Sequence, residues 1–361
     1  MKPFIIVGTR PEIVKMAPII YECENRGIDY YFLNTGQHYS DFMSSLIFED
    51  MGLRTPDNNL NVGSGTQSEQ TAKALVGIEK ELVHEKPDVV LVQGDTNAVL
   101  SAALASAKLQ IPLAHVEAGL RSYDQRMPEE HNRRLTDHVS DFLFAPTENS
   151  AEILRKENVW GKVFVTGNTV IDAVENRLPL ALERADPTIA AGFDSFALLT
   201  IHRSENVDNE AVLKGLVEGL LELEISILFP AHPRTVKQLN KFGLMSMIKS
   251  ADWIRVIEPV AYLDFLSLMK KCSFIMTDSG GIQEEATAPS INKRVFVLRT
   301  STERPEAVKS GHAEVVGVNP REFPSLVSES VQEGLDNARH CPYGRGDASR
   351  KILDILSKEF E

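Results

Sequence analysis

The chain has 361 residues, 43% of them hydrophobic and 25% charged, which is long enough for two globular domains of ordinary size. Its 51 acidic and 38 basic residues give a formal net charge of −13. This balance argues against a broad surface for nucleic acid or membrane, which would need a basic face, but not against a small anionic ligand held by a few local cations.

The three cysteines are scattered along the chain, at Cys23, Cys272 and Cys341, without a CxxC pair or zinc spacing. We therefore expect reduced thiols in a cytoplasmic protein. The apolar run at 4–8 is too short for a signal peptide. No stretch of the sequence approaches the roughly 20 apolar residues of a membrane helix.

Short apolar runs alternate with longer helical patterns, for example at 68–86 and 97–109. The runs of the first half are FIIVG (4–8), YYFLN (30–34), DVVLVQGD (88–95), IPLAHVEAG (111–119), DFLFAP (141–146) and KVFVTG (162–167). Continuous apolar strands separated by helices predict a parallel sheet that is covered on both faces.

The pattern begins again after a join near Gly167–Asp172. The runs of the second half are FALLTIH (196–202), ISILFPAH (225–232), WIRVIEP (253–259), SFIMTDSGG (273–281), RVFVLR (294–299) and AEVVGV (313–318). A last helical stretch, about 346–360, follows the turn-rich CPYGRGD. We therefore predict an α/β protein of two doubly wound units, with ligands beyond the carboxyl ends of the strands.

The segment TDSGGIQEEA (277–286) joins a glycine turn to a helix that carries two acids. The turn consists of Ser279, Gly280 and Gly281. Its N–H groups and hydroxyl would suit an anion, although such a turn also serves simply to pack a strand against a helix. Glu285, one turn further on, suits the hydroxyls of a ribose, whereas Glu284 would point into solvent or a structural contact. The segment thus predicts a nucleotide site rather than a bare phosphate site.

The first strand is followed by GTRPE (8–12), in which Thr9 and Glu12 have the spacing of a capping box. Arg10 and Lys15 would lie on the first turns of the helix. They are either ordinary surface cations or a clamp for a phosphate, and the motif alone does not distinguish the two.

Acidic residues follow two neighbouring strands of the first half, Asp95 in QGDTN and Glu117 in HVEAGLR, and Glu129 follows in MPEEHNRR. Carboxylates around one cleft suit proton transfer. The structural alternatives are a helix cap for Asp95 and a favourable first-turn charge for Glu129. His202, after the first strand of the second half, could neutralise a diphosphate, deliver a proton, or belong to an ordinary polar loop.

Taken together, these motifs resemble the non-hydrolysing UDP-N-acetylglucosamine 2-epimerases. The matching segments run in family order over nearly the whole chain: GTRPEIVKMAP (8–18), TGQH (35–38), VQGDTN (92–97), HVEAGLRS (115–122), MPEEHNRRLTDH (127–138), GNTVID (167–172), TDSGGIQEEA (277–286) and TERPE (302–306). The RPE of the first helix and the Lys15 that follows favour the non-hydrolysing branch.

The resemblance implies a GT-B architecture, with the active site in the cleft between two Rossmann-like domains. The expected parts are an N-terminal domain (1–168) with the acid and base residues, a UDP-binding domain (169–345), and a C-terminal helix (346–361) that packs back on the first domain. A homodimer is usual in the family.

The resemblance also implies roles for individual residues. Those implicated in catalysis are Asp95, Glu117, Glu129 and His202. Those implicated in binding the substrate and UDP are Arg10, Lys15, Phe265, Ser279, Gly280, Gly281, Glu285 and Arg304. Val260 replaces a common polar residue of the loop that should face the uracil, so the uracil would be contacted through the backbone, with Phe265 packing beside it. The segment TGQHYSDF of this chain differs from the form found in the regulated members of the family. An allosteric substrate site is therefore in doubt.

The activity implied is reversible epimerisation at C2 of UDP-GlcNAc to UDP-ManNAc. The C2 proton has no carbonyl beside it, so the family route loses UDP first, forms a 2-acetamidoglucal and adds UDP back. No net redox change occurs, so neither NAD nor another cofactor is expected, and no metal site is predicted. The rivals are an epimerase of a UDP-diacetamido sugar uronate, a GT-B glycosyltransferase and a non-catalytic nucleotide-sugar sensor.

Overall fold

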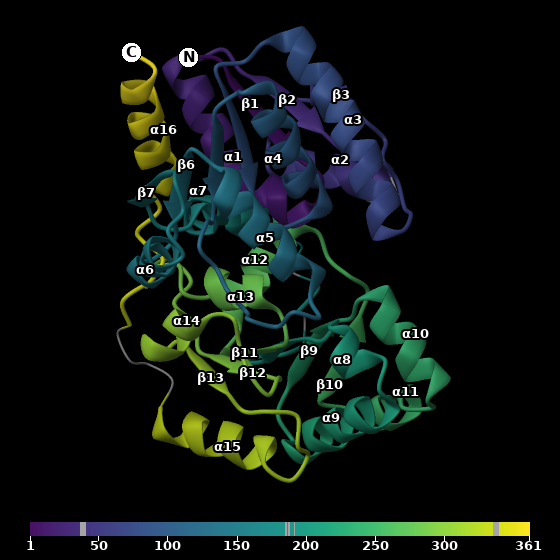
Figure 1. The fold of residues 1–361 in the computed structure, drawn as a ribbon. Helices are drawn as coiled ribbons and strands as arrows, with labels where there is room; N and C mark the ends of the chain where they lie inside the picture. Colours follow the sequence, from purple (N-terminus) through teal and green to yellow (C-terminus); the bar gives the residue numbers. More distant parts are fainter. Residues whose placement is uncertain (37–40, 185, 187, 191, 335–338) are drawn as a thin grey trace. The chain divides into compact units, whose positions relative to one another are not determined.

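The computed structural model describes residues 1–36, 41–184, 186, 188–190, 192–334 and 339–361 (Figure 1). The chain forms two compact units, Met1–Asn176 with Tyr343–Glu361 (unit 1), and Arg177–Pro342 (unit 2). Gln37 and His38 of the TGQH motif lie outside the described residues.

Unit 1 contains a seven-stranded parallel sheet in the order β3-β2-β1-β4-β5-β6-β7. Its strands are β1 (Pro3–Val7), β2 (Tyr31–Asn34), β3 (Asn58–Asn59), β4 (Val89–Gln93), β5 (Leu113–Val116), β6 (Phe142–Ala145) and β7 (Lys162–Val165). The sequence predicted all of these except β3, an exposed pair of asparagines at the sheet edge.

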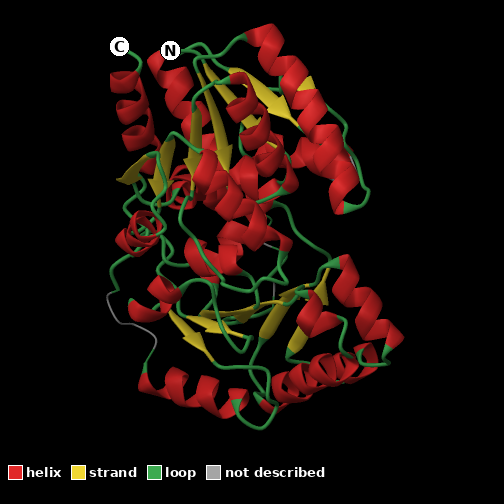
Figure 2. Ribbon diagram, viewed as in Figure 1, coloured by secondary structure: helices red, strands yellow, loops and turns green. Residues whose placement is uncertain are grey.

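The helices of unit 1 cover both faces of this sheet (Figure 2). They are α1 (Arg10–Arg26), α2 (Asp41–Asp50), α3 (Gln67–Glu85), α4 (Asn97–Leu109), α5 (Pro128–Val139), α6 (Glu148–Lys156), the first part of α7 (Thr169–Arg184), and α16 (Ala348–Glu359). The boundary between the units falls inside α7.

The last helix is anchored in unit 1. It runs beside α1 (Figure 1), where the Arg26 guanidinium lies 2.8 Å from the Asp354 carboxylate. At its first turn the buried carboxylate of Asp172 accepts the backbone N–H groups of Ala348 and Ser349, at 3.2 and 2.8 Å, and the Ser349 hydroxyl at 2.6 Å. An acceptor at this position satisfies helix N–H groups that have no partner within the helix.

Unit 2 contains a six-stranded parallel sheet in the order β10-β9-β8-β11-β12-β13. Its strands are β8 (Ala197–Thr200), β9 (Ile227–Pro230), β10 (Ile254–Ile257), β11 (Phe274–Thr277), β12 (Val295–Val297) and β13 (Ala313–Val315). Counted from its own first strand, this sheet has the order 3-2-1-4-5-6, as do the first six strands of unit 1. Both are Rossmann-like doubly wound sheets, and the predicted α/β class is confirmed.

The helices of unit 2 also flank their sheet (Figure 2). They are the end of α7, α8 (Ser204–Val207), α9 (Glu210–Glu222), α10 (Pro233–Lys241), α11 (Met245–Lys249), α12 (Tyr262–Lys271), α13 (Gly280–Glu285), α14 (Pro305–Lys309) and α15 (Phe323–Glu333).

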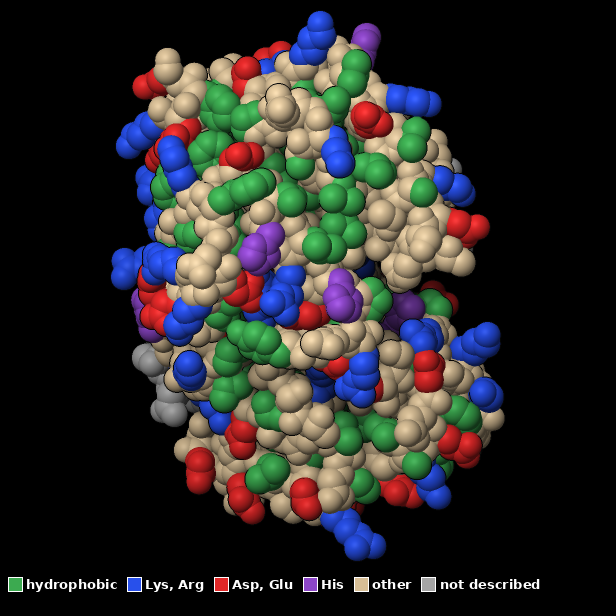
Figure 3. All heavy atoms as spheres, viewed as in Figure 1, with side chains coloured by type: hydrophobic (Ala, Val, Ile, Leu, Met, Phe, Trp, Pro, Cys, Tyr) green, Lys and Arg blue, Asp and Glu red, His purple; other side chains and the backbone are tan. Residues whose placement is uncertain are grey.

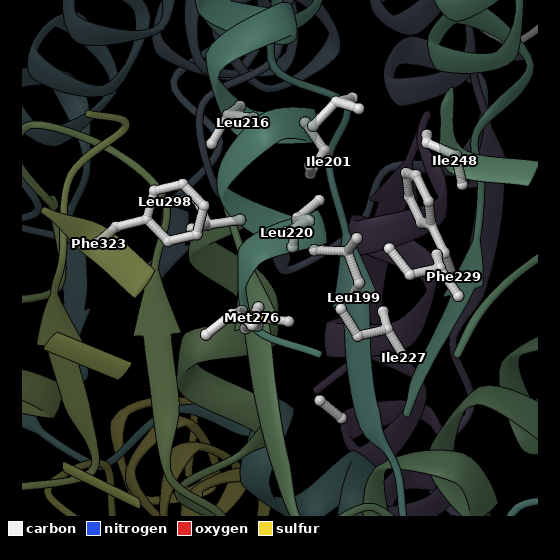
Figure 4. Packing of buried hydrophobic residues seen from close by; sticks show 14 of the residues in the cluster. Leu199, Ile201, Leu216, Leu220, Ile227, Phe229, Ile248, Met276, Leu298 and Phe323 are labelled. Atoms are coloured by element: carbon white, nitrogen blue, oxygen red, sulfur yellow. The ribbon is translucent and has the colours of Figure 1, made fainter. Parts of the chain in front are cut away.

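A hydrophobic core joins the helices of unit 2 to its strands. Leu216 and Leu220 of α9 face the strand residues Leu199 and Met276, and Phe323 of α15 lies beside them (Figure 4). Gly219 makes the approach of α15 possible, since a Cβ there would lie 2.3 Å from two ring carbons of Phe323.

We expect Gly219→Ala to lower the free energy of unfolding by about 1–3 kcal/mol, because overpacking the ring outweighs the gain in helix propensity of about 1 kcal/mol. Thermal and denaturant unfolding would measure the change. Glu218→Ala, at the exposed neighbouring position, is the control. Adding Phe323→Leu to Gly219→Ala should recover part of the loss, and strict additivity of the two changes would contradict the proposed clash.

Candidate functional site

Each sheet reverses its strand order next to its first strand, between β1 and β4 in unit 1 and between β8 and β11 in unit 2. Crevices at such points, beyond the carboxyl ends of the strands, are where doubly wound proteins bind ligands. The motifs GTRPE and QGDTN follow β1 and β4, and IHRSEN and TDSGG follow β8 and β11. Four of the motifs singled out in the sequence therefore occupy the two switch points.

The turn after β1 is built around Glu12. Its buried carboxylate accepts the backbone N–H groups of Gly8 and Thr9, at 2.5 and 3.2 Å, and completes the predicted capping box. Burial raises the pKa of Glu12 to about 7, and the nearby charge of Asp95 acts in the same direction. Arg10 is exposed at the start of the helix.

Lys15 and Glu117 form a buried ion pair, with the ammonium on the Glu117 Oε2 atom. The same oxygen accepts the side-chain amides of Gln93 at 3.0 Å and Asn168 at 3.4 Å. Glu117 has a φ of +70°, a conformation that non-glycine residues rarely adopt. The structure thus brings two predicted site residues together and holds one of them in a strained backbone.

Asp95 pairs with Arg133 of α5, whose Nε and Nη2 atoms donate to Asp95 Oδ2 at 3.0 and 2.5 Å. Arg133 also donates to the buried Glu130 at 3.0 Å. Glu129, in the first turn of α5, is exposed. The neighbouring acids of the MPEEHNRR motif therefore differ: Glu130 is buried and pairs with Arg133, whereas Glu129 is exposed to solvent.

Sequence reasoning did not single out His115 or Asp137. The Nδ1 atom of His115 lies 2.7 Å from Asp137 Oδ1, and its Nε2 atom lies 2.8 Å from the carbonyl oxygen of Gly94. Both side chains are completely buried between the loops that carry Asp95 and Glu117. The sequence feature that could have indicated them is a histidine, His115, within an otherwise apolar strand.

In unit 2, the buried carboxylate of Asp278 organises the loop after β8. It accepts the backbone N–H groups of His202 at 3.0 Å and Arg203 at 2.9 Å, and the Asn206 side-chain amide at 3.0 Å. The His202 Nδ1 atom lies 3.2 Å from Asp278 Oδ1, so the carboxylate orients a ring that is itself 42% exposed. Asp278 belongs to the predicted TDSGG motif, but the sequence assigned it no task.

The predicted glycine turn forms the start of α13, with Ser279 as its N-cap residue. A Cβ on the buried Gly280 would lie 3.7 Å from the Arg304 guanidinium and 3.9 Å from that of Arg203. The turn therefore combines helix N–H groups, no side chain at Gly280 and two guanidinium groups. These are the components of an anion site.

Glu284 is completely buried, with its Oε1 atom 2.5 Å from Arg304 Nε. This contact selects the structural alternative for Glu284 and excludes the solvent-exposed one. Glu285 is also buried and accepts the Tyr262 hydroxyl at 3.3 Å. Phe265 is half-buried on α12, the helix that carries Tyr262.

Three further properties bear on the class of protein. Among the described residues, no group of His, Cys, Asp and Glu side chains is arranged to hold a metal ion. Within the part of the chain that the structure describes, no helix combines the length and apolar character that crossing a membrane requires. On the face shown in Figure 3, acidic and basic side chains are interspersed.

The tandem Rossmann-like sheets place the chain in the GT-B-like class of two-domain α/β enzymes. A family model described as UDP-N-acetylglucosamine 2-epimerase matches residues 21–357. The UDP-N-acetylglucosamine 2-epimerase of Methanocaldococcus jannaschii is 47% identical over 370 residues, with 99% of each chain covered. The chain belongs to the UDP-N-acetylglucosamine 2-epimerase family, and it is an isomerase.

A solved structure and one further relative are informative. A crystal structure of Methanocaldococcus jannaschii UDP-GlcNAc 2-epimerase in complex with UDP-GlcNAc and UDP is 46% identical, has a TM-score of 0.88, and matches over 99% of this chain and 100% of that one. A UDP-2,3-diacetamido-2,3-dideoxy-D-glucuronate 2-epimerase of Pseudomonas aeruginosa is 36% identical, over 99% of this chain and all of that protein.

The raised pKa of Glu12 predicts how the free energy of unfolding changes with pH. The pKa is about 7 in the folded protein against an ordinary 4.5, so between these pH values the folded state binds more protons than the unfolded chain. The free energy of unfolding therefore falls as the pH rises through this range, by about 3 kcal/mol in total.

Glu12→Gln removes this titration. Relative to the wild type, the variant should gain up to about 3 kcal/mol of stability between roughly pH 5 and pH 8, as measured by denaturant unfolding at both pH values. Glu24→Gln, on the exposed side of α1, is the matched control. A Glu12→Gln difference that is the same at both pH values would contradict the buried titration.

Proposed function

We propose that this protein interconverts UDP-GlcNAc and UDP-ManNAc by epimerisation at C2. The observation that carries the proposal is the carboxylate of Glu117, which follows β5 and pairs with Lys15 of the helix after β1, in a chain that belongs to this family. The related crystal structure from Methanocaldococcus jannaschii, in which UDP-GlcNAc and UDP are bound to that protein, supports the choice of substrate.

The chemistry explains why both an anion site and carboxylates are needed. Direct removal of the C2 proton would leave an unstabilised carbanion. In the proposed route the C1–O bond breaks first, and UDP leaves with the electron pair. A base then takes the C2 proton, and the electrons of the C–H bond form the C1–C2 double bond of 2-acetamidoglucal. Protonation on the opposite face and re-addition of UDP give the epimer.

The groups of unit 2 suit the departing diphosphate. We propose that it binds at Ser279, Gly280 and Gly281, where Arg203 and Arg304 flank the helix start. Their positive charges stabilise the negative charge that develops as UDP leaves. Glu285 is proposed to accept the ribose hydroxyls, Phe265 to pack beside the uracil, and His202 to hydrogen-bond the diphosphate.

The groups of unit 1 suit the proton transfers at C2. We propose Glu117 as the base, because the buried Lys15 ammonium beside it stabilises a carboxylate. Asp95 and Glu129 are proposed to serve the other proton transfers, and Arg10 to contact the substrate. Homodimer formation and a cytoplasmic location stay predictions.

Incubation with UDP-GlcNAc in D2O tests the proposal directly. We expect NMR to show deuterium at C2 of both epimers, without any acceptor sugar present. Glu117→Gln should lower the rate by roughly 10²–10⁴-fold, and the exposed Glu148→Gln should not. Epimerisation that leaves C2 free of solvent deuterium would reject the proton-exchange route.

The same assay separates the rivals. Turnover only when an acceptor is added would indicate a glycosyltransferase, and return of unchanged UDP-GlcNAc a sensor. Selective turnover of a UDP-diacetamido sugar uronate would point to the specificity for which the Pseudomonas aeruginosa relative is named.

The proposed diphosphate site makes a separate binding prediction. Arg203→Ala and Arg304→Ala should each weaken UDP binding by about 1.5–3 kcal/mol, the usual range for a hydrogen bond to a charged group. Isothermal titration calorimetry with UDP would measure it. Arg234→Ala, an arginine of unit 2 that pairs with Asp208, is the control. Unchanged UDP affinity in both site variants would contradict the assignment.

A further inference from the structure

His115 lies at the centre of a largely buried polar network that the proposed chemistry does not use. Its ring is enclosed between the carbonyl oxygen of Gly94, at 2.8 Å, and the Asp137 carboxylate, at 2.7 Å. Asp137 also accepts the Arg121 guanidinium at 2.7 Å and the backbone N–H of Gly119 at 3.2 Å. Arg121 in turn pairs with Glu157.

The chemistry of the partners defines the protons on the ring. A carbonyl oxygen only accepts hydrogen bonds, so the Nε2 atom of His115 must donate to Gly94. Arg121 and the Gly119 N–H both donate to Asp137, which favours its ionised form, and an ionised carboxylate also only accepts. The Nδ1 atom must then donate as well, and a ring with two donors is an imidazolium cation.

The partners of Asp137 favour its ionised form. Burial alone would raise the pKa of Asp137, but the positive charges and hydrogen bonds of His115 and Arg121 hold it below its ordinary value. The charged groups that face His115 and Asp137 are Arg121 on the loop after β5 and, beyond it, Glu157 after α6. Arg134 and His138 of α5 lie 3.7 and 3.5 Å from the Glu157 carboxylate.

The position of the network relates it to the two acids of the proposed mechanism. Gly94 directly precedes Asp95 on the loop after β4, and Gly119 follows Glu117 by two residues on the loop after β5. Gly119 itself is restricted, since it has a φ of +85° and a Cβ there would lie 2.4 Å from the Ser150 carbonyl oxygen. His115 thus links the loops of both carboxylates to α5.

We propose that His115 is a positioning residue, which as a buried imidazolium paired with Asp137 fixes the spacing of the Asp95 and Glu117 loops for proton transfer at C2. The proposal rests on the proposed function. It assigns His115 no contact with the substrate, because the ring is fully buried and both nitrogens are engaged.

The first test reads the protonation state without using activity. The wild-type protein, with ¹⁵N-labelled histidine, should show an imidazolium with both ring nitrogens protonated at about pH 8, where an ordinary histidine is neutral. This signal should be lost in Asp137→Asn, which keeps the size of the side chain but removes its charge. Neutral rings for all nine histidines at that pH would overturn the proposal.

The second test separates positioning from binding. His115→Gln should lower kcat by roughly 100-fold, as expected for a small misplacement of reacting groups. The KM and the Kd for UDP should change little, since the proposed diphosphate contacts belong to unit 2. His84→Gln, at an exposed site on α3, should behave as wild type. A folded His115→Gln variant with wild-type kcat would overturn the proposal.

The outcomes distinguish this inference from the proposed function. A wild-type protein that does not epimerise would reject the function, whatever the ¹⁵N spectrum shows. An active wild type that lacks the imidazolium, or an unaffected His115→Gln, would reject only the positioning by His115. If His115→Gln fails to fold, the wild-type spectrum and its Asp137→Asn comparison still decide the matter.

Discussion

The reversal of strand order beside β1 and beside β8 is the constraint from which the rest of the site follows. In these parallel sheets the loops with polar residues follow the carboxyl ends of the strands. Only where the strand order reverses do neighbouring loops turn to opposite faces of the sheet, which leaves a crevice between them. Each unit has one such point. Unit 1 places carboxylates and Lys15 there, and unit 2 places a glycine turn with two guanidinium groups.

The loops that follow the carboxyl ends of the strands are held in place by buried acidic side chains. In each case a buried carboxylate accepts backbone N–H groups of a loop and so fixes its path: Glu12 for Gly8 and Thr9, Asp137 for Gly119, Glu130 for Ser122, and Asp278 for His202 and Arg203. Burying a carboxylate is unfavourable unless it is hydrogen-bonded or paired. The residues that present polar groups outward therefore depend on acids that are themselves buried.

Much of this arrangement could be predicted from the sequence. Short apolar runs between longer helical patterns predicted the strands, and Gly280 with its neighbours marked a helix start at a strand end. The strand β3 could not be predicted, because its two asparagines carry no apolar pattern and pair through the backbone alone. The two asparagines form a strand only because the folded sheet offers them the backbone of β2 to pair with.

Contacts between residues that are distant in the sequence could not be predicted either. Lys15 and Glu117 pair across 102 positions of the chain, and neither motif indicates the other. On the sequence alone Glu284 could be solvated or structural, and only its contact with Arg304 decides between the two. His115 sits in an apolar strand where a histidine suggests only a satisfied core residue, and its two acceptors come from different elements.

The proposed function depends most on the binding of a pyrophosphate at the turn that begins α13. A crystal structure of the protein with bound UDP tests this most directly. We expect the diphosphate on the backbone N–H groups of Gly280 and Gly281, within hydrogen-bonding distance of Arg203 and Arg304. A nucleotide bound elsewhere, with both guanidinium groups remote from its phosphates, would contradict it.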